Sequence, residues 1–172
     1  MANSATPAAL AQPAPISLTY PATPQAWVQF ASTLNQWLQY VAGTPVAFTP
    51  TLTATSGAPV YSVQTARYVR NGSAVTFSAT LAISSIGSLT GPVSVAGLPV
   101  LSQNTLSVGT AFPVYAPGVT PSGTNYAPVG YLAPGMSAIQ IYMEGSATPA
   151  PLAASQLGSG SALLISGTYF IL

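Results

Sequence analysis

Residues 68–84 read YVRNGSAVTFSATLAIS, and two patterns within them favour a β-hairpin. From Val75 to Ser84, apolar side chains alternate with Thr, Ser and Ala, which is the period of a strand with one buried face. The pair Asn71-Gly72 stands just before this run. Asn-Gly favours a type I′ turn, in which both central residues need a positive φ. We therefore predict a hairpin with Asn71 and Gly72 at its turn.

The rest of residues 44–172 also has the pattern of a β domain. We expect further strands at residues 48–55, 60–63, 93–100, 138–143 and 162–171. Turns rich in Gly and Pro separate these runs. Short strands at this spacing predict an antiparallel β-sandwich or a jelly roll. The fold class is therefore mainly β, preceded by an extended N-terminal arm and one α-helix.

Residues 112–134 have a different composition from the strands around them. They contain five prolines and three tyrosines, Tyr115, Tyr126 and Tyr131. Long loops of this kind usually serve a function or an interface. We interpret the segment as a long structured loop. Three roles stay open for its tyrosines: stacking on a sugar ligand, packing the loop itself, or contacting another subunit.

The N-terminal part of the chain divides into an arm and a helix. Residues 1–22 are rich in Ala and Pro, which predicts an extended arm that needs a neighbouring subunit to become ordered. Residues 23–43 predict an amphipathic helix, with Pro24 in its first turn and Gly43 just past its end. The apolar residues of this helix are spaced alternately three and four apart: Trp27, Phe30, Leu34, Trp37 and Val41. This spacing predicts either a short coiled coil between copies of the chain or a helix that packs on its own sheet.

Only three side chains carry a formal charge, Arg67, Arg70 and Glu144, and the chain has no His and no Cys. A typical soluble domain is about 25% charged, whereas this chain is 2% charged. Nearly neutral surfaces favour association. Two readings stay open, an adaptation to an unusual milieu such as low pH and the burial of much of the surface in an assembly.

This composition excludes most kinds of chemistry. A nucleophilic Ser needs an adjacent base, and a glycosidase pair needs two carboxylates. We therefore expect no enzyme activity, no cofactor and no metal site. With a net charge of +1, the chain lacks the basic surface that nucleic-acid binding requires. Every apolar run is also too short for a membrane-spanning helix.

The β portion resembles a domain that recurs in the virion proteins of tailed bacteriophages, such as tail-fibre, head-fibre and minor structural proteins. The resemblance rests on the order of four short segments: FTPTLT at 48–53, YVRNGSAVTF at 68–77, GPVSVAGLP at 91–99 and LISGTY at 164–169. It covers roughly residues 47–172. It departs from the family pattern at Leu52, where the family has Trp, and at Arg70-Asn71, where the family has Gly.

The resemblance implies a virion structural protein, a homotrimer with a jelly-roll-like domain. We expect it to be part of a fibre or a capsid decoration, attached through its arm and helix to other proteins of the capsid, neck or tail. Two alternatives stay open: a receptor- or glycan-binding module that uses the 112–134 loop, and a subunit of a cellular surface layer or filament.

Overall fold

The computed structural model describes residues 24–102, 107–145 and 148–171. One α-helix, α1 (Pro24–Ala42), precedes ten strands and a short 3-10 helix, η1 (Ala154–Gln156). The strands are β1 (Val46–Phe48), β2 (Thr51–Thr53), β3 (Val60–Asn71), β4 (Ala74–Ser85), β5 (Ser94–Ala96), β6 (Thr110–Tyr115), β7 (Asn125–Leu132), β8 (Ile139–Gly145), β9 (Ala150–Pro151) and β10 (Ala162–Phe170). The arm expected at residues 1–22 lies outside the described residues.

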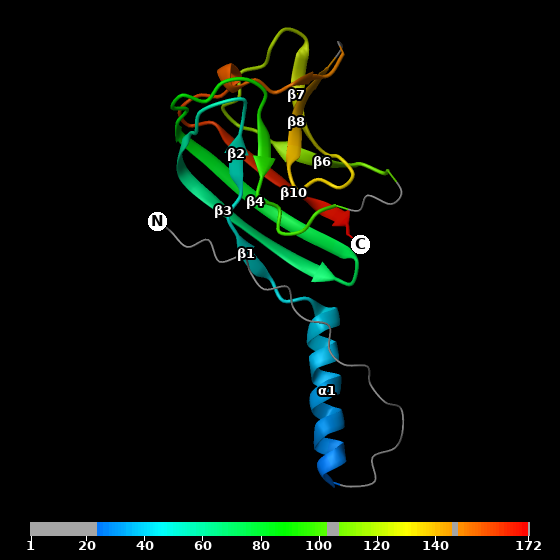
Figure 1. The fold of residues 1–172 in the computed structure, drawn as a ribbon. Helices are drawn as coiled ribbons and strands as arrows, with labels where there is room; N and C mark the ends of the chain where they lie inside the picture. Colours follow the sequence, from blue (N-terminus) through cyan, green and yellow to red (C-terminus); the bar gives the residue numbers. More distant parts are fainter. Residues whose placement is uncertain (1–23, 103–106, 146–147, 172) are drawn as a thin grey trace.

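All pairings between these strands are antiparallel. The strand order is β1-β3-β4-β10-β6-β7-β8-β5-β2, and β9 pairs with β8. The sheet curls into two layers, as Figure 1 shows, with β1, β3, β4 and β10 in one layer and β2, β5, β7 and β8 in the other. The expected fold class, a mainly β antiparallel sandwich with one helix, is confirmed.

The hairpin of β3 and β4 forms as its alternation predicts, but its turn lies one residue later than expected. Asn71 pairs with Ala74, so the two loop residues are Gly72 and Ser73. Gly72 has a φ of 58°, and Asn71 is not among the described residues with a positive φ. A glycine at the first loop position is the pattern of a type II′ turn. The prediction of a type I′ turn centred on Asn71 and Gly72 is therefore wrong, because the glycine alone meets the conformational requirement.

The prediction of a long loop at residues 112–134 is also wrong, because this segment contains most of β6 and all of β7. The prolines of this segment argue against strands, because Pro has no backbone N–H to donate to a neighbouring strand and is rare in central strands. Up to Pro113, β6 pairs with β7, and from Val114 on it pairs with β10. Pro113 thus marks the place where β6 passes from one layer to the other, a corner typical of sandwiches whose strands switch sheets.

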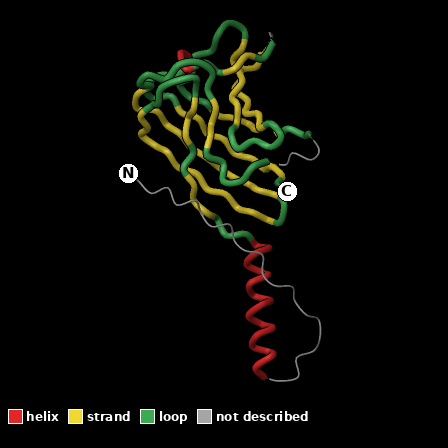
Figure 2. Tube along the Cα trace, in the orientation of Figure 1, coloured by secondary structure: helices red, strands yellow, loops and turns green. Residues whose placement is uncertain are grey.

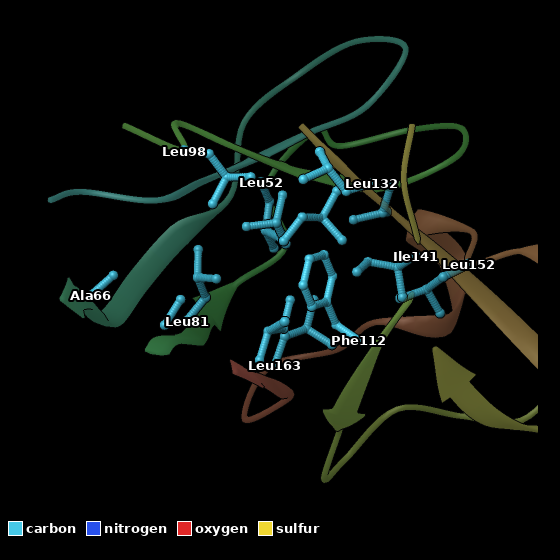
Figure 3. Close-up of a cluster of buried hydrophobic side chains, with 14 of the residues drawn as sticks. Leu52, Ala66, Leu81, Leu98, Phe112, Leu132, Ile141, Leu152 and Leu163 are labelled. Carbon is cyan, nitrogen blue, oxygen red and sulfur yellow. The ribbon is translucent and has the colours of Figure 1, made fainter. Parts of the chain in front are cut away.

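The core lies between the two layers and has Phe112 near its centre. Figure 3 shows the Phe112 ring with Leu163 on one side and Ile141 on the other. The ring meets Phe77 edge to face, with 5.2 Å between centroids, a favourable geometry for two aromatic rings. Gly167 lies beside the ring, where a Cβ would collide with it. The glycine at position 167 of β10 therefore makes room for the Phe112 ring in the core.

Tyr169 is the largest fully buried side chain, and its hydroxyl donates a hydrogen bond to the Val100 carbonyl, 2.9 Å away. Burial raises the pKa of Tyr169 from 10.0 to about 12. Because the folded pKa is above the unfolded value, the stability that the neutral hydroxyl contributes is complete below about pH 10 and is lost as the pH rises through about 12.

We therefore expect the melting temperature of the full chain to fall between about pH 10 and pH 12. Tyr169→Phe has no hydroxyl to ionise, so its melting temperature should fall less over that interval. Calorimetry at a series of pH values measures both. An equal fall in the variant and the unaltered chain would show that Tyr169 does not carry the effect.

The helix α1 extends away from the β domain, as Figures 1 and 2 show. Gly43 follows its last residue with a φ of 62°, which is the usual left-handed end of a helix. A Cβ at Gly43 would collide with Val69 of β3, so the chain leaves the helix in close contact with that strand. The remainder of α1 stands clear of the sandwich in the figures. The alternative in which α1 packs as a core helix on its own sheet is therefore wrong.

Candidate functional site

The apolar face of α1 is the first candidate for an interaction site. Trp27 is 47% exposed and Leu34 is 39% exposed. Phe30 lies between them and meets Trp27 edge to face, with 6.0 Å between ring centroids. The side chains of Trp37 and Val41 lie outside what the structure describes. Of the five predicted oligomerisation residues, the structure thus brings three together along one side of a projecting helix.

The energetics of α1 favour a partner for this face. Helices in proteins gain most of their stability from packing of an amphipathic face, and isolated short helices are marginal in water. The first turn of α1 has no acidic residue and its last turn no basic one, so charges do not support the helix dipole. The exposed Trp27 and Leu34 side chains, on a helix with no charged residue, would gain free energy from burial against a partner.

The three tyrosines predicted as contacts do not form one site. Tyr115 ends β6, is 68% exposed and lies opposite Leu164 of β10. Tyr126 is 67% exposed and stands beside the irregular start of β7, where the register with β8 shifts. Tyr131 lies near the other end of β7, opposite Ala111 of β6. Because these side chains sit at separate places on the sheet, they cannot all contact one small ligand.

Two residues that the sequence interpretation left out lie beside Tyr131. Gln140 is opposite Tyr131 in the register of β7 and β8, and Tyr142 is opposite Val129. The Tyr142 hydroxyl donates a hydrogen bond to Gln140 Oε1, at 3.2 Å. The alternation of Ile139, Gln140, Ile141 and Tyr142 indicates that Gln140 and Tyr142 share the outer face of their strand. No local sequence pattern, however, indicates that this face adjoins Tyr131.

A second surface surrounds Arg67 on the outer face of β3. Ala47 and Ser78 flank Arg67 in the register. Arg67 lines two open hollows, one of about 500 Å³ and one of about 560 Å³. Arg70, by contrast, donates from Nε to the Gly72 carbonyl at 2.9 Å within its own hairpin. Arg67 is thus an exposed cation on a face of small side chains.

Two kinds of feature are absent from the part of the chain that the structure describes. No group of three or more His, Cys, Asp or Glu that could hold a metal ion occurs there. Nor does that part contain a helix long and apolar enough to cross a membrane.

Comparison with known proteins shows a similarity to a solved structure. No protein-family profile matches the chain, and no curated protein matches it. Among solved structures, the chain is similar to the crystal structure of the Dettilon tailspike protein, with a TM-score of 0.62 and 21% sequence identity. The match covers 76% of this chain and 24% of the tailspike chain. The β-sandwich of this protein therefore shares its fold with one part of a much longer tailspike protein.

Proposed function

We propose that this protein is a structural component of a bacteriophage virion, in which the β domain is held outward on a stalk formed by α1. The observation that carries the proposal is the fold shared with a tailspike protein over 76% of the chain. The order of short segments that resembles phage virion domains is a separate argument in its favour, as is the near absence of charge.

Self-association through α1 is part of this proposal. The helix α1 projects from the domain, and along its apolar face Trp27 and Leu34 are exposed while Phe30 between them is half-buried. Packing this face against the same face of other copies buries the rings without disturbing the sandwich. The spacing of three and four residues is that of a coiled coil, and the family resemblance favours three copies. The proposed role is assembly and display, without catalysis.

The experiment that tests the proposal is immunoelectron microscopy of purified particles. Antibodies against residues 44–172 should label particles from a culture in which the protein is made, at regular positions on the capsid, neck or tail. Antibodies raised against a cytoplasmic host protein serve as the control. Labelling of a cell-surface layer or of filaments, with unlabelled particles, would contradict the proposal and favour a cellular surface subunit.

Attachment through the arm gives a separate prediction. Deleting residues 1–22 should leave the melting temperature of the β domain within a few degrees of that of the full chain, because the described core is built from residues between Leu52 and Ile171. The deletion should reduce the amount of protein in purified particles, measured by quantitative mass spectrometry against the major capsid protein. Unchanged incorporation would show that attachment does not use the arm.

A further inference from the structure

The outer face of β6, β7 and β8 presents an aromatic ring next to polar groups. Ala111, Tyr131 and Gln140 lie side by side across the three strands. Gly130 and Ile141, which alternate with them along the strands, are buried in the core. Tyr131 and its neighbours therefore point away from the core, on a sheet face that holds them at fixed spacing.

The Tyr131 ring is held in place from one side. Gly109 lies so close that a Cβ there would collide with the ring. The side chain of Tyr131 is 38% exposed, and its cross-strand neighbour Ala111 is small and exposed. A fixed ring beside a small neighbour forms a platform on which a flat apolar group can rest, with little loss of side-chain entropy on binding.

The polar groups beside this platform are also oriented. Because the Tyr142 hydroxyl donates to Gln140 Oε1, the Gln140 side chain is tied at its oxygen and keeps its two N–H donors for another acceptor. The Tyr142 oxygen keeps its acceptor capacity. The face thus combines an apolar platform with at least one donor and one acceptor, all of them uncharged.

We propose that Tyr131, Gln140 and Tyr142 bind a neutral hexose unit of a polysaccharide. A pyranose ring has one face of C–H groups, which packs on the electron-rich face of an aromatic ring, and an edge of hydroxyls that accept and donate hydrogen bonds. The Tyr131 ring supplies the packing surface, and Gln140 and Tyr142 supply the hydrogen bonds. Both arginines lie on β3 in the other layer, so this face offers no cation to an acidic sugar.

The position of the face in the molecule favours a sugar over a second copy of the chain. In Figure 1, β7 and β8 stand at the end of the β domain away from α1. Self-association through α1 therefore takes place at the opposite end of the β domain from these strands. The inference rests on the proposed function in one point, that copies associate through α1 and not through this face. Sugar binding by the full chain is measured independently of its oligomeric state.

The test is saturation-transfer NMR and calorimetric titration of the full chain with maltohexaose, cellohexaose and mannohexaose, and with hexagalacturonate as the acidic comparison. We expect at least one neutral hexasaccharide to bind. Tyr131→Ala should weaken that binding by roughly tenfold or more through loss of the platform. Gln140→Glu, which keeps the size of the side chain and removes its donors, should weaken it several-fold. Tyr126→Ala, which removes a more exposed tyrosine of the same strand, should leave it unchanged.

Three results would overturn the inference. The first is that none of the three neutral hexasaccharides binds, or that only hexagalacturonate does. The second is binding that survives both Tyr131→Ala and Gln140→Glu. The third is dissociation of the oligomer by Gln140→Glu in light scattering, which would make this face a contact between copies. A monomeric full chain that still binds a neutral hexasaccharide would refute self-association and leave the sugar site intact.

Discussion

Replacing Leu34 by Asp is expected to convert the assembled protein into a monomer of 17.3 kDa. Leu34 is the middle residue of the apolar face of α1 and is 39% exposed in the single chain. Burial in a helix bundle would place the new carboxylate among apolar groups, where an unpaired charge is very costly. Removing a packed Leu side chain alone costs about 2–5 kcal/mol for each copy. Light scattering on the full chain measures the change in mass.

Asn35→Asp is the matched control for this variant. It adds the same carboxylate to the same turn of α1, at an exposed position one residue further on. The control should keep the mass of the unaltered protein. If Leu34→Asp and Asn35→Asp had the same mass as the unaltered chain, the apolar face of α1 would not be the contact between copies.

Phe112→Ala should destabilise the β domain by about 3–5 kcal/mol, the usual cost of removing a buried Phe ring. The ring is 2% exposed, meets Phe77 at 5.2 Å and fills the space that Gly167 leaves open. The cavity left by this change would lie between the two layers, which β6 joins on either side of Pro113. Denaturant unfolding at a fixed protein concentration measures the loss of stability.

Phe170→Ala is the corresponding control. It removes the same side chain from the last residue of β10. The Phe170 side chain is 58% exposed there. Exposed substitutions of this kind change stability by about 0.5 kcal/mol or less. Phe112→Ala should therefore lower the free energy of unfolding by more than Phe170→Ala does. Equal losses would show that packing of the Phe112 ring does not stabilise the core.

Some elements of the fold follow directly from local sequence. The alternation from Val75 to Ser84 corresponds to β4, whose buried residues include Val75, Phe77 and Leu81. The pattern predicts this strand because one face carries apolar side chains and the other carries short, mostly polar ones. In the same way, Pro24 and Gly43 bracket α1 as their backbone preferences require.

Other elements depend on tertiary structure and could not be predicted from local patterns. Pro113 and Pro128 stand within β6 and β7, where local preference argues against a strand. Their strands form because the pairing with β10 and β8 and the burial of Phe112 outweigh that preference. The place of the hairpin turn likewise depends on the register of β3 with β4, which brings Asn71 opposite Ala74.

Of the candidate sites, one follows from local sequence and the other depends on tertiary structure. The spacing of Trp27, Phe30 and Leu34 reveals their shared face from the sequence alone, because a helix brings such residues together locally. The neighbourhood of Tyr131 is not local. Gln140 reaches it only through the antiparallel register of β7 and β8, which no short segment of sequence specifies. The tyrosine was therefore identified, but its polar neighbours were not.

If copies of the chain assemble through α1, the mass of the unaltered full chain in solution must exceed that of one copy. Sedimentation equilibrium over a range of concentrations gives that mass without reference to molecular shape. We expect a homotrimer, with three times the 17.3 kDa of one chain. A single species of 17.3 kDa at every concentration would contradict it.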